Sequence, residues 1–180
     1  MKNADAVVKV RGSSRMTPTE TADLVALLQK RRGLRSVKLH QNSLGKNPER
    51  TIPILNALAS VDALQMINVA ANNLGSDADV TAAAIDFVKK AKNLESINMN
   101  DNFGERDGEN STKIMGHYVK IENITSLEFR GNWLRWHPEG ADALAKMLGE
   151  GSSLKLKSID LGENFSFRHE RRDDVECAPR

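Results

Sequence analysis

The sequence lacks the features that would place it in a membrane or in an oxidising compartment. It contains a single cysteine, Cys177, which cannot form an internal disulfide, and this is typical of a chain kept in a reducing compartment. No run of 18 apolar residues occurs, so no membrane span is predicted. The apolar run near the N-terminus is too short for a signal peptide. We therefore expect a soluble, cytoplasmic protein.

Charge of one sign and aromatic rings are also scarce. The 26 basic residues almost balance the 24 acidic ones, which leaves a formal net charge of +2, and aromatic residues make up only 4% of the chain. Nucleic-acid binding relies on a strong positive field or on rings that stack against bases, so no nucleic-acid partner is expected. The length of 180 residues suits one ordinary domain or one compact array.

What the sequence does contain is a pattern that returns five times. In the stretch LQMINVAANNLG, residues 64–75, the apolar residues and one asparagine follow the form L-x-x-L-x-L-x-x-N-x-L. Neither the period of a strand nor that of a helix accounts for the whole pattern. Matches start near residues 34, 64, 94, 124 and 156. This near-constant spacing indicates a repeat architecture, in which neighbouring units stack to bury a shared core.

The pattern resembles the leucine-rich repeat family, and its period and helical second half are most similar to the ribonuclease-inhibitor-like subfamily. The resemblance covers residues 34–165, with residues 1–33 as a degenerate N-terminal repeat or cap. It implies an α/β fold, a leucine-rich-repeat solenoid forming a right-handed horseshoe segment, with parallel strands on the concave face and helices on the convex face. Residues 166–180 are expected to form a charged C-terminal tail.

The asparagine of each repeat is assigned a structural role. After each strand the chain must turn inside the stack, which leaves backbone donors and acceptors without strand partners, and a buried amide can satisfy both kinds of group. We predict a ladder formed by Asn42, Asn72, Asn102, Asn132 and Asn164. Asn164 also begins an Asn-x-Ser sequon, but a glycan would not fit inside the ladder.

Helices are predicted between the strands. Thr17 and Glu20 form a capping-box pattern with Pro18 at the first helical position. Thr51 is predicted to cap a second, short helix, with Pro53 tolerated in its first turn. Apolar spacing predicts three further helices, around Val80–Val88, Ile114–Val119 and Pro138–Leu148. Val7, Val8 and Val10 are interpreted as the strand of the degenerate first repeat.

The C-terminal edge of the predicted stack has no evident cover. The last predicted strand, Ser158–Leu161, is followed only by the charged tail, whereas terminal repeats normally carry a cap. Either the tail folds over this edge, or the chain is a piece of a longer protein, and we expect the second. A third outcome is self-association through the open edge.

No arrangement of residues in the sequence indicates catalysis. The four histidines, His40, His117, His137 and His169, show no metal-ligand spacing. Cys177 has no neighbouring histidine that could activate it as a nucleophile. We therefore predict no catalytic residue, no metal site and no cofactor, and a protein that is not an enzyme.

The outward-facing residues of the strands are the predicted binding surface. In the first two of the five matches, which start near residues 34 and 64, they carry one charge, Lys38. In the last three matches they carry four carboxylates against Arg130 alone, a local charge of −3. This acidic half favours a basic protein partner over a phosphate backbone. The alternative interpretation is that the charges only keep the surface soluble. The residues assigned to partner binding on this face are Lys38, His40, Asn68, Asn98, Asn100, Asp101, Glu128, Arg130, Asp160 and Glu163.

Both tryptophans of the chain, Trp133 and Trp136, lie in one predicted loop and are added to the partner-binding set. Tryptophan is a frequent anchor at interfaces. The alternative is that at least one of them packs beneath the helix that follows.

These patterns together predict a non-enzymatic protein–protein interaction module. The resemblance leaves open a GTPase-regulating or a cytoskeletal, actin-regulator-like leucine-rich-repeat protein, because function resides in the site and not in the fold. A GTPase regulator would need an exposed loop arginine, for which Arg15, Arg106 and Arg135 are the candidates. The first repeat is faintly similar to the start of a tropomodulin repeat domain.

Overall fold

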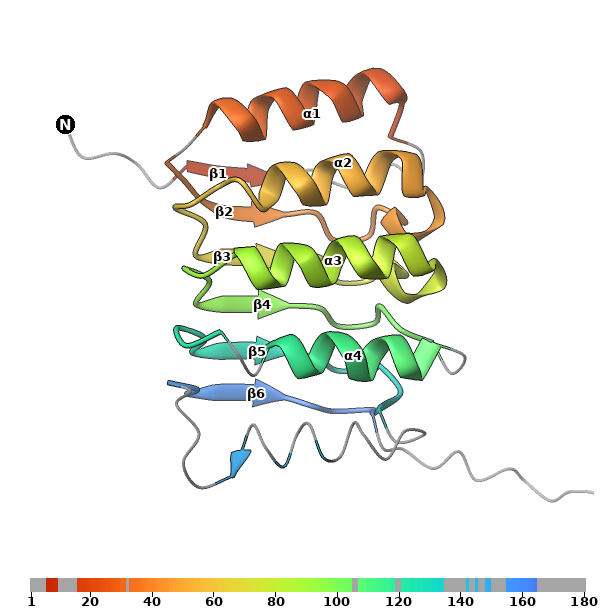
Figure 1. Cartoon of the computed structure of the whole chain (residues 1–180), viewed down its shortest axis with the longest axis vertical. Coiled ribbons are helices and arrows are strands. Elements are labelled where there is room, and N and C mark those ends of the chain that lie inside the picture. The colour runs from red at the N-terminus through yellow and green to blue at the C-terminus, as the bar shows by residue number, and fades with distance from the viewer. Residues whose placement is uncertain are drawn as a thin grey trace, which may run out of the picture.

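The computed structural model describes residues 6–9, 16–31, 33–104, 107–118, 121–134, 142, 145, 148–149 and 155–164. Within these residues a six-stranded sheet runs in sequence order from β1 to β6, and every neighbouring pair of strands is parallel (Figure 1). The strands are β1 Ala6–Lys9, β2 Leu34–Lys38, β3 Met66–Asn68, β4 Ser96–Asn98, β5 Ser126–Glu128 and β6 Ser158–Asp160.

The register of the sheet follows the spacing of the sequence pattern. Ile67 of β3 pairs with Val37 of β2 on one side and with Ile97 of β4 on the other. Leu127 and Ile159 continue the same row through β5 and β6. Equivalent residues of successive repeats therefore lie side by side. Val7 and Val8 of the predicted first strand belong to β1, and Val10 lies outside the described residues.

The described helices all lie on one side of the sheet (Figure 1). They are α1 Pro18–Lys30, α2 Pro48–Leu58, α3 Ala78–Lys90 and α4 Gly108–Tyr118, with the short 3-10 helices η1 Leu44–Lys46 and η2 Leu74–Ser76 leading into α2 and α3. This one-sided arrangement of parallel strands and helices confirms the predicted α/β solenoid. The helix predicted around Pro138–Leu148 and the tail 166–180 lie largely or wholly outside the described residues. None of the described helices combines the length and apolar character needed to cross a bilayer.

The core lies between the sheet and the helices. Leu64, Ile67, Val69 and Leu74 of the third repeat are all at most 3% exposed, which explains the unequal spacing of these apolar residues. The first three flank or belong to a strand, and Leu74 begins η2. In the next repeat the buried ring of Phe103 lies near the end of the turn and stacks on Phe129, with ring centroids 6.1 Å apart. Each repeat thus supplies one layer of a continuous core.

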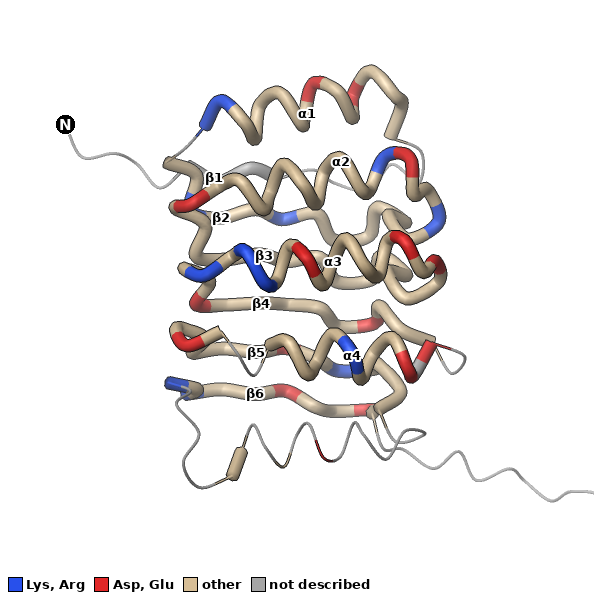
Figure 2. Tube along the Cα trace, viewed as in Figure 1, with Lys and Arg blue, Asp and Glu red and all other residues tan. Residues whose placement is uncertain are grey.

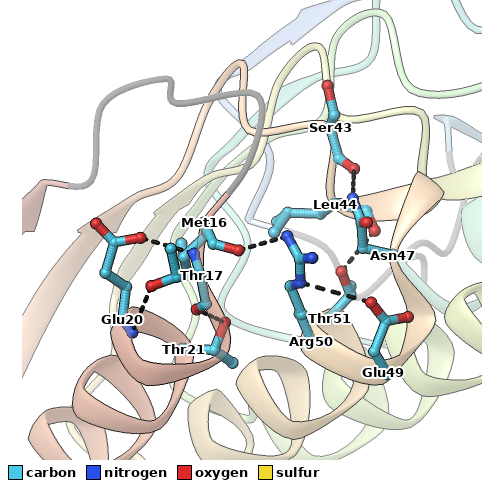
Figure 3. Close-up of polar contacts among 10 residues, drawn as sticks. All are labelled: Met16, Thr17, Glu20, Thr21, Ser43, Leu44, Asn47, Glu49, Arg50 and Thr51. Carbon is cyan, nitrogen blue, oxygen red and sulfur yellow. Dashed lines mark hydrogen bonds and ion pairs between the residues drawn. The ribbon is translucent and has the colours of Figure 1, made fainter.

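The predicted capping box begins α1 (Figure 3). The Thr17 hydroxyl accepts a hydrogen bond from the Glu20 amide at 3.2 Å, and the Glu20 carboxylate accepts one from the Thr17 amide at 2.6 Å. The hydrogen bond from the Thr17 amide holds the pKa of Glu20 below its ordinary value. Arg50 of α2 donates to the carbonyl of Met16, so the start of α1 is also bound to the next helix.

The predicted cap at Thr51 is wrong. Helix α2 begins at Pro48, because proline suits the first helical position, and Thr51 lies inside the helix. Its hydroxyl donates to the carbonyl of Leu44 (Figure 3). Thr81 makes the equivalent bond to the carbonyl of Leu74, at 3.1 Å, in the next repeat. A threonine therefore binds each of α2 and α3 to the turn before it. Pro53 also lies within α2, beyond its first turn.

Candidate partner-binding face

A column of buried asparagines closes the turns that follow β2, β3, β4, β5 and β6. The Asn72 side chain accepts a hydrogen bond from the Asn42 amide at 2.8 Å and donates to the carbonyls of Leu39 and Val69, each at 2.8 Å. Asn102 accepts from the Asn72 amide at 3.2 Å, and the same contact continues along the column. The five side chains are at most 4% exposed and are those of Asn42, Asn72, Asn102, Asn132 and Asn164.

The residue before each asparagine has a left-handed backbone in the turns that the structure describes. The φ angle is 59° at Gln41, 55° at Ala71 and 56° at Asp101, and only Gly131, at 68°, is a glycine. Glu163 repeats the conformation at 57°. A residue with positive φ turns the backbone out of the extended strand direction. These residues therefore lie where each strand segment ends.

The sheet face opposite the helices is called the open face here, and it corresponds to the predicted concave face (Figure 1). Neighbouring strands are about 4.8 Å apart, so equivalent side chains form rows across the sheet. The first row runs through Ser36, Met66, Ser96, Ser126 and Ser158. The second row runs through Lys38, Asn68, Asn98, Glu128 and Asp160. The charge in the second row changes from positive at β2 to negative at β5 and β6 (Figure 2).

The middle of the open face is uncharged. Met66 is 42% exposed, which is high for a large apolar side chain, and Ala70 and Ala71 follow it beyond the end of β3. Met66 was not assigned to partner binding from the sequence, although its outward position in the repeat could have identified it. An exposed methionine is adaptable and suits a binding surface.

A polar network fixes the carboxylate of Glu128 on β5. The side-chain amide of Asn98 donates to Glu128 Oε2, and that of Asn100 donates to the same oxygen at 3.4 Å. Both asparagines are themselves held, because the Asn98 oxygen accepts from the Asn100 amide at 3.1 Å and the Asn100 oxygen accepts from the Arg130 amide at 2.8 Å. Glu128 is therefore oriented before any partner arrives.

Arg130 is the basic residue of this acidic half. Its guanidinium forms an ion pair with Glu163, and Asp160 and Asp101 are close enough to act on it electrostatically. The hydrogen bond to Glu163 and the charge of Glu163 raise the pKa of Arg130, and the same hydrogen bond and the charge of Arg130 lower the pKa of Glu163. Together with Glu128, these residues keep the local charge at −3, since four carboxylates face one guanidinium.

The residues assigned to partner binding spread over the whole open face. Lys38 and His40 belong to the β2 end, about 14 Å, or three strand spacings, from β5. Trp133 is half-buried in the turn after β5, with a φ angle of 55°. Trp136 lies outside the described residues, as do Arg15, Arg106 and Arg135. Among the described residues, no group of three or more His, Cys, Asp or Glu side chains could hold a metal ion.

No family model matches the chain, and no curated protein matches it in sequence. Among solved structures, the C-terminal domain of tropomodulin from Caenorhabditis elegans is similar, with a TM-score of 0.61 and 13% identity over 84% of this chain and 85% of that one. The chain has the leucine-rich-repeat fold. The leucine-rich repeat-containing protein LegL7 from Legionella pneumophila shows 18% identity with a TM-score of 0.43, over 78% of this chain and 51% of that one.

For a leucine-rich-repeat solenoid, the open face is the part of the sheet that its own helices leave free. In this chain it offers a fixed carboxylate at Glu128, an exposed Met66 and a charge that changes sign from β2 to β6. These groups can form hydrogen bonds, ion pairs and apolar contacts. The assignment to the ribonuclease-inhibitor-like subfamily stays a prediction.

Proposed function

We propose that this leucine-rich-repeat chain is a non-enzymatic interaction module that binds a basic segment of a protein partner through its open face. The observation that carries the proposal is the Glu128 carboxylate, held by Asn98 and Asn100. A group that is already oriented loses little conformational freedom on binding, so more of its interaction energy contributes to affinity.

Electrostatics supports the class of partner. Besides Glu128, the acidic half contributes Asp101 and Asp160, and no cation forms an ion pair with these three among the described residues. A partner with lysine or arginine side chains would complement this surface and would be steered towards it. Met66 supplies an apolar contact at the centre of the same face.

A paired pull-down from lysate tests this proposal. One bait is the native chain, and the second carries Asp101→Lys, Glu128→Lys and Asp160→Lys. A control bait carries the same charge change at three exposed residues outside the open face, Asp62→Lys, Asp86→Lys and Glu122→Lys. Far-ultraviolet circular dichroism and a thermal melt verify that all three are folded.

The expected result is a basic partner that the native and control baits retain and the open-face bait loses. Its binding should also weaken as salt rises, because exposed charges are screened. Identical partners on all three baits would contradict the proposal.

The second candidate is the cytoskeletal, actin-regulator-like role. Similarity to the tropomodulin C-terminal domain over most of both chains supports it, although at 13% identity this similarity concerns the fold. A filament-elongation assay with purified actin is the direct test. Elongation that stays unchanged at every concentration of the chain would rule this candidate out.

A further inference from the structure

Arg130 occupies an unusual position on the open face. It follows β5, and its guanidinium pairs with Glu163 beyond the end of β6. Its backbone amide is bound to the Asn100 side chain at 2.8 Å, so the point from which the side chain extends is fixed. Within the described part of the chain, Glu163 is the only residue with which Arg130 forms an ion pair.

This ion pair is open to solvent. The side chains of Arg130 and Glu163 are 49% and 58% exposed. Ion pairs of this kind contribute little to stability, because water already solvates both charges well. A second cation could therefore replace the guanidinium at Glu163 at small cost, without disturbing the buried core.

The position of Arg130 also affects the neighbouring carboxylates. Asp160 and Asp101 interact with the guanidinium through its charge. Glu128 lies two residues before it on the same strand face. One positive charge among these groups lowers the attraction that each of them exerts on an incoming cation.

We propose that Arg130 is a specificity-determining residue that acts as an internal counter-ion, occupying the cation position of the open face until a lysine or arginine of the partner displaces it. The proposal rests on the function proposed above, that the open face binds a basic segment. It implies that Arg130 weakens the binding of every cationic segment. Only a segment with several basic residues, which can pair with Glu128 and Asp160 as well as with Glu163, then binds well.

The test uses a fluorescein-labelled octalysine peptide as the probe and fluorescence anisotropy at 50 mM and 200 mM sodium chloride. Four forms of the chain are compared. They are the native chain, Arg130→Gln, the control Lys89→Gln, and a variant with Asp101→Asn, Glu128→Gln and Asp160→Asn. Lys89 is a matched control because it is also an exposed cation in an ion pair, with Asp86 at 3.6 Å, but lies on α3.

The expected result is that Arg130→Gln binds octalysine about three- to tenfold more tightly than the native chain, with a smaller gain at the higher salt concentration. Lys89→Gln should change binding by less than about twofold, since its charge is remote from the open face. An equal gain in both variants would overturn the proposal, because net charge alone would then explain it.

Two other outcomes separate this proposal from the proposed function. Unchanged or weaker binding by Arg130→Gln, together with loss of binding in the triple variant, would reject the counter-ion role and leave the open face as the binding site. Unchanged binding in the triple variant would reject both. A thermal melt of each variant, expected within about 2 °C of the native chain, verifies that the fold is intact.

Discussion

At the scale of single residues, the Asn72 side chain satisfies several buried backbone groups in and around the turn after β3. Its side chain serves the Asn42 amide and the carbonyls of Leu39 and Val69, and it is fully buried. In Asn72→Ala these backbone groups would lose their partners in a place that water does not reach. Each such group costs about 1–3 kcal/mol, so we expect a loss of about 3–5 kcal/mol in the free energy of unfolding, measured by urea denaturation.

The matched control for this variant is Asn56→Ala. Asn56 is an exposed residue of α2, so its replacement should change stability by no more than about 0.5 kcal/mol. Similar losses in both variants would show that the Asn72 contacts carry little of the stability.

The second prediction concerns the threonine hydroxyls that donate hydrogen bonds from a helix to the preceding turn. Thr81 donates to the turn carbonyl of Leu74, whereas Ser111, at the same place one repeat later, is fully buried and its hydroxyl has no hydrogen-bond partner among the described residues. We expect Thr81→Val to cost about 1–2 kcal/mol and Ser111→Ala to be neutral or stabilising, because a buried hydroxyl without a partner is unfavourable. Thermal melts of both variants measure this, and a larger loss in Ser111→Ala would contradict it.

The left-handed turn residues give a third prediction. Ala71, with a φ angle of 55°, has a conformation that costs an alanine about 1–2 kcal/mol, and the equivalent residue two repeats later is Gly131. Ala71→Gly should therefore stabilise the chain by about 0.5–1 kcal/mol in urea denaturation. Ala82→Gly, at an exposed position inside α3, should have the opposite sign and cost about 1 kcal/mol. Two changes of the same sign would contradict the assigned turn conformation.

At the scale of elements, the capping box makes the start of α1 sensitive to acid. The pKa of Glu20 is lower in the folded chain than in the unfolded chain, so the contribution of its carboxylate is present above the ordinary glutamate pKa and is lost as the pH falls through the folded value. Between about pH 5 and pH 3 the stability difference between the native chain and Glu20→Gln should therefore shrink. Melting temperatures at several pH values measure this difference. A difference that stays constant over that range would show that the Glu20 charge does not support the cap.

The start of a helix is predicted correctly from the sequence where a single local capping motif determines it. The box at Thr17 and Glu20 correctly gives the start of α1, because its two hydrogen bonds are local. At α2 both Pro48 and Thr51 are candidates for the start of the helix, and the helix begins at Pro48. Thr51 instead donates to the carbonyl of Leu44, a tertiary contact that the sequence pattern does not reveal. The left-handed turns also escape prediction, since Gln41, Ala71 and Glu163 are not residue types that favour this conformation.

At the scale of the whole molecule, the repeat period of the sequence predicts the stacked architecture. It does not predict the side-chain contacts of the open face. Stacking at a constant spacing requires that equivalent residues become neighbours, so the register of Val37, Ile67 and Ile97 follows from the pattern alone. The contacts within the open face do not follow from it. The pairing of Arg130 with Glu163 and the orientation of Glu128 depend on side-chain geometry between repeats, which the pattern does not encode.

The last prediction concerns how far a local change travels through the stack. The Asn132 side chain accepts from the amides of Asn102 and Phe103, at 2.9 and 3.1 Å, and donates to the carbonyl of Met99 at 3.0 Å. These contacts join the turn after β4 to the turn after β5. In a repeat protein, stability is close to a sum of unit and nearest-neighbour terms, so Asn132→Ala should weaken mainly this one junction.

Amide hydrogen exchange measures the effect along the chain. The amide of Met99 bonds across the weakened junction, to the carbonyl of Glu128, and should exchange much faster in Asn132→Ala. The amide of Phe129 bonds across the next junction, to the carbonyl of Asp160, and should change less. The amide of Leu39, which bonds to the Asn68 carbonyl at 2.7 Å, lies two junctions away and should change least. Equal acceleration at all three amides would mean that the stack opens only as a single cooperative unit. An acceleration that decreases from Met99 to Leu39 would instead confine the weakening to the junction between β4 and β5, where Asn98 and Asn100 hold Glu128. Local opening and the proposed partner binding would then involve the same repeats.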